Sequence, residues 1–240
     1  MTKFVSKETI TRLLKDVKDI IKNPLIESNI YYVHDDEDMM RGYAMIIGQS
    51  DTPYSGGYYL FELNYPLDYP HSPPKVKYCT NGNSVRFNPN LYTCGKVCVS
   101  LLNTWSGDQW TSCQNISTVL LTLCTLLCKN PLLNEPGVSI KNTDIEPYNE
   151  IIQYANINIA ICDIVNKKEG LFLPFFNLFW PYIKEHFLRN YDKLLEFVEN
   201  KNNEFNKEAR TFKTSNYNMK MDIDYNKLIL KLNKSKKNIE

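Results

Sequence analysis

The chain shows its first regular pattern over residues 7–22, where apolar residues recur at the spacing of an amphipathic helix. Ser6 is a suitable N-cap, and Pro24 stops the pattern. Positions off the apolar face carry basic residues, as a solvent-exposed helix surface ordinarily does. We therefore expect a helix with one buried face, formed by Ile10, Leu13, Leu14, Val17, Ile20 and Ile21.

Four short segments rich in β-branched and aromatic residues come next, at residues 30–34, 41–47, 57–64 and 75–80. Acidic or Gly/Pro-rich turns separate them, and no helical pattern lies between them. Short strands in that arrangement predict a four-stranded antiparallel meander. The connection at residues 65–75 carries four prolines, which cannot donate backbone hydrogen bonds, so it is expected to form a rigid, extended loop.

Two further helices are predicted after the strands. Residues 116–128 repeat apolar side chains at helical spacing, and the pattern ends at Pro131 and a following turn. A second helix is expected to begin at Pro147, a residue suited to a first helical turn, and to run to about residue 166. Helix, meander and helices in this order predict an α+β domain over residues 1–168.

The chain changes character near Gly170, and residues 169–240 are expected to form a helical C-terminal extension. An aromatic-rich part leads into a helix, a polar stretch at residues 201–222 follows, and a short amphipathic helix comes last. The first helix carries an apolar stripe that needs a partner, so we expect the extension to pack on the core as a stabilising cap. Docking of a partner protein is the alternative. The stripe consists of Ile183, Phe187, Tyr191, Leu194 and Val198.

Composition narrows the classes of function. The chain has 240 residues and a net charge of +1, so its overall charge gives no indication of nucleic-acid binding. Its apolar runs are shorter than the roughly 20 residues that span a bilayer, and it shows no secretory leader pattern. The seven cysteines are then expected to be free thiols in a reducing cytoplasm or nucleus. We expect a monomer.

Four cysteines fall into two similarly spaced pairs, Cys94 with Cys98 and Cys124 with Cys128. Structural zinc sites favour tighter cysteine pairs together with histidines, so this spacing argues against a metal. Cys124 and Cys128 share one face of a predicted apolar helix, where a thiol behaves as a small hydrophobe. The first pair, Cys94 and Cys98, is therefore the one to consider for a reactive thiol.

Cys98 is a candidate nucleophile that needs no strong base. A thiol hydrolase would need one of the three histidines, His34, His71 or His186, close to the thiol, and none has the sequence context of a cysteine protease. A thiol that accepts an acyl group from a thioester needs proximity and an oxyanion donor instead. A neutral amide suits that role, and Asn90 stands eight residues before Cys98. The same Asn-Pro-Asn stretch is also an ordinary turn sequence.

The segment from about Tyr58 to Gly137 resembles the catalytic core of ubiquitin-conjugating enzymes. It carries a YP…DYP…PPKV loop and strand, NPN where the family has His-Pro-Asn, a cysteine eight residues later, a tryptophan, a helix and a gate loop, NEPG. The GKVC segment, the LLNTW insertion and the aromatic tail are most similar to the large Z-type enzymes. The order of elements extends the resemblance to roughly residues 6–166, and it implies the fold of that family.

The resemblance implies roles for residues of the active site. Cys98 matches the thioester-forming cysteine, and Asn90 matches the asparagine that stabilises the oxyanion. Glu135 is expected to be the acidic gate residue that orients the attacking lysine. Asn88 replaces the family's histidine, which holds the loop by hydrogen bonding. The residues expected to support the site are Asn88, Pro89 and Asn134.

The resemblance also implies contact surfaces. Arg12 and Lys15 match basic positions that dock the activating enzyme. His71, Ser112 and Cys113 fall in the loops that contact ligases, where they depart from the common family pattern.

The function that the resemblance implies is transfer of ubiquitin, or of a ubiquitin-like modifier. The modifier would arrive from an activating enzyme as a thioester, pass to Cys98, and leave to a substrate lysine or a ligase. Such an enzyme needs no cofactor and no metal of its own, because the activating enzyme uses the ATP. Nucleic acid and membrane are not expected among the partners. The alternative is a catalytically inactive, ubiquitin-binding variant of the same fold.

Overall fold

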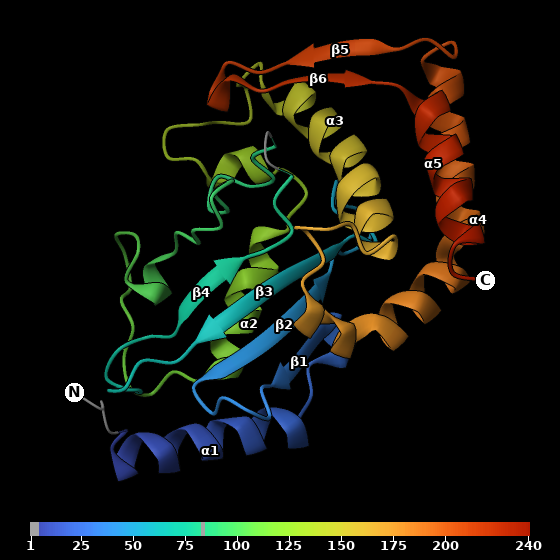
Figure 1. Cartoon of the computed structure of the whole chain (residues 1–240). Coiled ribbons are helices and arrows are strands. Elements are labelled where there is room, and N and C mark those ends of the chain that lie inside the picture. Colours follow the sequence, from blue (N-terminus) through green and yellow to red (C-terminus); the bar gives the residue numbers. More distant parts are fainter. Residues whose placement is uncertain (1–4, 83–84) are drawn as a thin grey trace.

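The computed structural model describes residues 5–82 and 85–240 and is built around a four-stranded sheet (Figure 1). The strands pair antiparallel in chain order, which confirms the predicted meander. Helices lie on both sides of this sheet, so the fold is α+β, as the sequence predicts. The strands are β1 (Ile30–His34), β2 (Arg41–Ile47), β3 (Tyr58–Asn64) and β4 (Lys75–Tyr78).

The two central strands of the sheet, β2 and β3, are buried on both faces. Side chains alternate across β2, so Ala44 and Ile46 belong to one hydrophobic cluster while Met45 and Ile47 belong to another. All four are at most 2% exposed, and Leu60 of β3 joins the second cluster. An unbroken apolar run is the pattern expected of a strand that is covered on two sides.

The first face is covered by three helices that precede the extension. They are α1 (Lys7–Lys22), α2 (Ile116–Leu126) and α3 (Ile145–Ala155). Their buried apolar residues form one cluster with Ala44 and Ile46, except Tyr154 of α3, which belongs to the second cluster. This layer supports the loops that carry Cys98.

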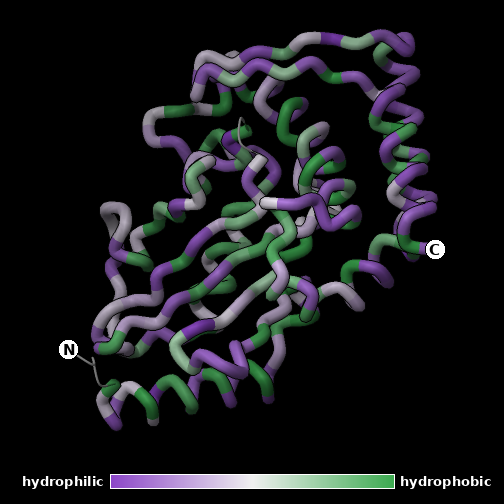
Figure 2. The backbone as a smooth tube through the Cα atoms, in the orientation of Figure 1, coloured by the Kyte–Doolittle hydropathy of each residue, from purple (hydrophilic) through white to green (hydrophobic). Residues whose placement is uncertain are grey.

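Helix α1 has the predicted bounds but a narrower buried face. Ser6 Oγ accepts a 3.0 Å hydrogen bond from the Thr9 amide, as an N-cap does. Hydrophobic and hydrophilic residues alternate along this helix (Figure 2). Leu14 and Ile21, expected to be buried, are 43% and 66% exposed. Two polar residues, Thr9 and Asp16, are buried on the face instead, because each is hydrogen-bonded.

The helix expected to begin at Pro147 begins two positions earlier, at Ile145. A proline is tolerated there because the first-turn amides of a helix have no partner within the helix. The helix continues past Ala155 as a π-helical segment, Asn156–Asp163, which the sequence pattern does not distinguish from an α-helix. Asn156 lies at the junction, where its side chain accepts a hydrogen bond from Tyr59 of β3 at 2.7 Å.

The second face of the sheet is covered by the C-terminal extension. A 3-10 segment, Pro174–Phe179, leads into α4 (Trp180–Glu204), which lies beside α5 (Tyr225–Lys237) at the right of Figure 1. Phe176 and Phe179 are fully buried in the cluster that contains Met45 and Leu60. None of the helices within the described ranges is both long and apolar enough to cross a membrane.

The polar stretch at residues 201–222 contains a hairpin that the sequence analysis did not predict. Its strands are β5 (Arg210–Lys213) and β6 (Lys220–Ile223), and they run across the top of Figure 1. Each strand has only four residues and mostly polar side chains, which is too little to give a strand pattern. The hairpin nevertheless brings a turn from the extension close to the N-terminal end of α3.

His186 of α4 is expected to make the stability of the folded chain depend on pH. Its Nδ1 lies 3.0 Å from the hydroxyl of Tyr58 in β3, and burial, with a smaller contribution from Arg189, lowers its pKa. The unfolded chain therefore binds more protons than the folded chain as the pH falls through about 6.5, so the free energy of unfolding should decrease there. We expect urea unfolding at pH 7.5 and 5.5 to show this loss, and His186→Asn, which stays neutral, to reduce it. An unchanged pH dependence in the variant would contradict the assignment.

Candidate active site

Cys98 lines a small cavity between three loops. The cavity has a volume of about 50 Å³. It is lined by Pro89, Asn90, Tyr92, Cys98, Trp105, Asn134, Glu135 and Pro136. Cys98 itself is 3% exposed. The fold thus brings together five of the residues that the sequence analysis singled out, from segments more than thirty positions apart.

Asn90 is held against Cys98 by two hydrogen bonds. The Cys98 amide donates to the Asn90 carbonyl oxygen at 2.9 Å, and Asn90 Nδ2 donates to the Cys98 carbonyl oxygen at 2.6 Å. Asn90 Oδ1 is buried and has no hydrogen-bond partner among the described residues. Because an amide nitrogen carries two hydrogens, Nδ2 keeps one for a group that enters the cavity.

Asn88 fastens the loop that carries Asn90. It is fully buried, its Oδ1 accepts a 2.8 Å bond from the Asn90 amide, and its Nδ2 donates at 2.7 Å to the carbonyl oxygen of Leu126 at the end of α2. The Nδ2 also lies 3.3 Å from the Tyr54 hydroxyl. A neutral side chain with one acceptor and two donors can therefore anchor the loop where the family has a histidine.

The insertion after Cys98 folds back over the thiol. Cys98 Sγ donates to the Thr104 carbonyl oxygen at 2.9 Å, and Thr104 Oγ1 accepts a bond from the Val99 amide at 2.9 Å. The next residue, Trp105, borders the cavity and is 46% exposed. The insertion is recognisable in the sequence but these contacts are not, because nothing in the spacing of LLNTW indicates which backbone carbonyl meets the thiol.

Glu135 borders the cavity and contacts the C-terminal extension. Its Oε2 accepts a hydrogen bond from the Tyr217 hydroxyl at 2.5 Å. Tyr217 lies in the turn of the β5–β6 hairpin, inside the stretch that appeared merely polar. Asn134 next to Glu135 has a buried Nδ2 with no partner among the described residues.

The three histidines lie in other contacts, so the geometry does not support a cysteine–histidine hydrolase. His34 bonds to Tyr32 and to a backbone carbonyl, His186 contacts Tyr58, and His71 lies 3.5 Å from Glu8. Across residues 5–82 and 85–240, no three histidine, cysteine, aspartate or glutamate side chains gather as metal ligands would.

The two basic residues expected on the docking face of α1 differ in exposure. Lys15 is exposed. The guanidinium of Arg12 lies 3.0 Å from Asp16 and donates to the carbonyl oxygens of Ser112 and Gln114 at 2.5 and 2.6 Å. Arg12 therefore ties α1 to a loop, which the sequence analysis did not foresee for a residue on a solvated helix face.

The residues expected to contact ligases lie on two loops that touch each other. His71, Ser112 and Cys113 are all exposed. Trp110 Nε1 donates to the Pro70 carbonyl oxygen at 2.7 Å, which joins the proline-rich loop to the loop after the insertion. The three side chains are thus presented from one composite surface.

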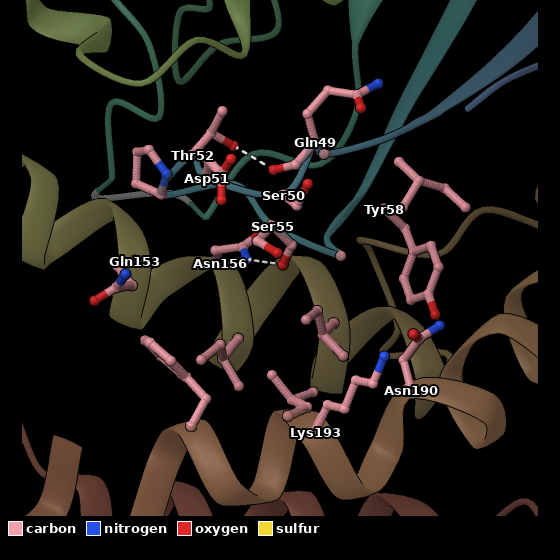
Figure 3. Close-up of a pocket in the computed structure, with 18 of the residues that line it drawn as sticks. Gln49, Ser50, Asp51, Thr52, Ser55, Tyr58, Gln153, Asn156, Asn190 and Lys193 are labelled. Carbon is pink, nitrogen blue, oxygen red and sulfur yellow. Dashed lines mark hydrogen bonds between the residues drawn. The ribbon is translucent and has the colours of Figure 1, made fainter. Parts of the chain in front are cut away.

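A larger cleft of about 840 Å³ lies away from Cys98, where the core meets α4 (Figure 3). Its wall on the core side includes Gln49, Thr52 and Asn156, and Lys193 of α4 faces them. At one end, Lys201 of α4 forms a 3.0 Å ion pair with Glu150 of α3. This cleft is the seam between the two parts of the chain.

Comparison with known proteins gives a family match over most of the core. A family model described as ubiquitin-conjugating enzyme matches residues 12–154. The chain is 40% identical over 190 residues to the ubiquitin-conjugating enzyme E2 Z of Danio rerio, covering 78% of this chain and 56% of the relative. The corresponding enzyme of Homo sapiens is 43% identical over 164 residues, covering 67% of this chain and 46% of the relative.

A third relative is similar over a shorter segment. The dual E2 ubiquitin-conjugating enzyme/E3 ubiquitin-protein ligase BIRC6 of Homo sapiens is 45% identical over 123 residues, which are 48% of this chain and 2% of the relative. The chain spans about half the length of the E2 Z relatives that it matches.

Proposed function

This chain belongs to the ubiquitin-conjugating enzyme family and is similar to its Z-type members, and from that premise we propose that it carries ubiquitin, or a ubiquitin-like modifier, as a thioester on Cys98 and transfers it to an amine or a ligase. One observation carries the proposal furthest: Cys98, Asn90 and Glu135 line the same cavity, although they come from three separate loops.

The first step is an exchange between thiols. The Cys98 sulfur attacks the carbonyl carbon of a modifier held as a thioester on the activating enzyme, so one carbon–sulfur bond forms and another breaks. The proton of the Cys98 thiol ends on the departing thiol of the activating enzyme. Bond energies hardly change, so the step depends on positioning more than on a base. The Thr104 carbonyl must release the thiol for the step to occur, since Sγ donates to it in the structure.

The second step moves the acyl group to an amine. The amine nitrogen attacks the thioester carbon, an oxyanion forms, and Cys98 leaves as a thiolate that then takes up the proton lost by the amine. The free hydrogen of Asn90 Nδ2 can donate to the oxyanion, because the other is used on the Cys98 carbonyl. The Glu135 carboxylate, on the rim of the cavity, can accept a hydrogen bond from the incoming amine and orient it.

The partners of this chemistry are a modifier, an activating enzyme and an acceptor protein. We propose that the exposed residues Lys15, Leu14 and Ile21 of α1 contribute to docking the activating enzyme, and that Arg12 acts by holding α1 to the neighbouring loop. The composite surface of His71, Ser112 and Cys113 is the proposed ligase contact.

The Z-type similarity is compatible with a dedicated activating enzyme or a ubiquitin-like modifier. We propose action as a monomer in the cytoplasm or nucleus, with no cofactor of its own.

A second candidate function is ubiquitin binding without catalysis. It is favoured by the low exposure of Cys98 and by the hydrogen bond that directs its thiol to Thr104. In that case the insertion would stay closed over the thiol, and no thioester would form.

A charging assay decides between the two. The protein is incubated with ubiquitin, an activating enzyme and ATP, and the products are separated on a gel with and without reductant. We expect one adduct that reductant removes, and we expect Cys98→Ser to give an adduct that resists reductant because it is an ester. Cys94→Ser, which changes the exposed neighbouring thiol, is the control and should charge like the parent. If the protein forms no thioester with any activating enzyme tried, including one that serves Z-type conjugating enzymes, the result would favour ubiquitin binding without catalysis.

A further inference from the structure

The turn of the C-terminal hairpin contacts the rim of the active-site cavity. Tyr217, in the turn between β5 and β6, donates its hydroxyl hydrogen to Glu135 Oε2 at 2.5 Å. A tyrosine is protonated at neutral pH, and burial, followed by this hydrogen bond, raises the pKa of Tyr217 further, so its hydroxyl is a donor. Glu135 also lines the cavity, and this hydrogen bond occupies only one of its two carboxylate oxygens. Tyr217, a residue of the extension, thus binds one of the two carboxylate oxygens of Glu135.

The turn adopts a costly backbone conformation to reach this position. Tyr217 has φ 64° and ψ 7°, and Asn218 has φ 49°, both in the left-handed region that non-glycine residues rarely adopt. Neighbouring contacts hold it there: the Asn216 amide donates to Asp144 Oδ2 at 2.7 Å, just before α3. Backbone strain of this kind persists only where the surroundings enforce it, and it is concentrated at functional sites.

Arg86 joins the hairpin turn to the loop that carries Asn90. Its guanidinium lies over the ring of Tyr92, 3.4 Å from the centroid, and over the ring of Tyr217, 4.9 Å from the centroid. It also donates to the carbonyl oxygens of Asn88 and Pro89, at 3.1 and 2.6 Å. Movement of the turn would therefore disturb both sides of the cavity.

We propose that the C-terminal hairpin completes the active site and that Tyr217 is a positioning residue, which fixes the Glu135 carboxylate so that Oε1 meets the incoming amine. The inference rests on the proposed function, because it assigns Tyr217 to the amine-transfer step. A stabilising cap would need only apolar contacts with the sheet. The hairpin turn instead places a hydroxyl on Glu135, the carboxylate that lines the cavity among the residues that the structure describes.

A double-mutant cycle on discharge to free lysine tests the inference. The parent, Tyr217→Phe, Glu135→Ala and the double variant are first charged, and loss of the thioester is then followed at several lysine concentrations. Phenylalanine removes the donor and keeps the ring that stacks on Arg86. We expect Tyr217→Phe to lower the rate at saturating lysine by about tenfold, as for loss of a hydrogen bond to a charged group. In the Glu135→Ala background the same change should cost less than about twofold, because its partner is gone.

The control is Tyr182→Phe, which changes another tyrosine of the extension, one that packs on Tyr31 of β1 and is 48% exposed. It should discharge at the parent rate.

Two outcomes of the cycle would overturn the inference. If Tyr217→Phe lowered the discharge rate equally in both backgrounds, the tyrosine would act on the structure in general. If Tyr217→Phe discharged at the parent rate, the tyrosine would have no role in the step. If the parent itself forms no thioester, the proposed function fails and the inference falls with it. If the parent does form the thioester but the cycle shows no coupling between Tyr217 and Glu135, the proposed function stands and only the inference is overturned.

Discussion

Replacing Asn90 by alanine should slow transfer from the Cys98 thioester to lysine by about 10²–10³-fold, the usual cost of removing one oxyanion donor. The reason is that Nδ2 donates one hydrogen to the Cys98 carbonyl at 2.6 Å and keeps a second one, and Asn90 lines the same cavity as Cys98, on which the thioester would form. Asn90→Asp should lose as much, because a carboxylate of the same shape has no hydrogen to donate. Single-turnover discharge of the purified thioester measures both.

The loss from Asn90 variants should be larger for discharge than for charging, because attack of a thiolate on a thioester is faster than attack of a lysine amine and depends less on a single oxyanion donor. Asn81→Ala is the matched control, because its Nδ2 also donates to a backbone carbonyl, that of Thr93 at 3.0 Å, but outside the cavity. It should change discharge by less than about twofold. If Asn90→Ala slowed charging and discharge equally and also lowered the unfolding temperature, Asn90 would be a loop anchor and not an oxyanion donor.

Replacing Phe176 by alanine should lower the free energy of unfolding by about 3–5 kcal/mol. Its ring is fully buried between the outer face of the sheet and the extension, and it meets the ring of Tyr43 edge-on at a centroid distance of 6.3 Å. Its removal leaves a cavity in the interface that fastens the extension. Chemical denaturation of the whole chain gives the free energy.

Two other variants make the result interpretable. Leu178→Ala lies on the same 3-10 segment but is 48% exposed, so it should cost no more than about 0.5 kcal/mol. Phe176→Leu should lower the free energy of unfolding by an intermediate amount, and it replaces the alanine variant in the measurement if that variant does not stay soluble. Equal unfolding midpoints for Phe176→Ala and Leu178→Ala would show that the extension contributes little to the stability of the sheet.

The core of the fold was predictable because each of its elements has a local signal. The helix over residues 7–22 has apolar spacing and a serine cap, and the strands at 30–34 and 41–47 have the composition and spacing of a meander. The candidate site was predictable for a different reason. Its residues occur in a motif that resembles a known family, and the motif fixes their spacing around Cys98.

The remaining features depend on contacts between distant segments. Tyr217 lies in a polar stretch, and nothing near it in the sequence indicates Glu135, 82 positions earlier, as its partner. Arg12 has the sequence context of a solvated residue, but it reaches carbonyl groups 100 and 102 positions away. Such contacts leave no periodic pattern, so they emerge only from the folded chain.

The burial of β2 and β3 on both faces has a consequence for how the chain is made. The strands leave the ribosome early, whereas the groups that cover their second face come much later, as the bond from Tyr58 to Ile183, 125 positions onward, illustrates. Contacts of such long sequence separation form slowly. During synthesis the outer side of β2 and β3 is therefore an open apolar surface, of the kind that chaperones bind and that aggregation exploits. The nascent chain is therefore most prone to aggregation after β4 has been synthesised and before α4 has been.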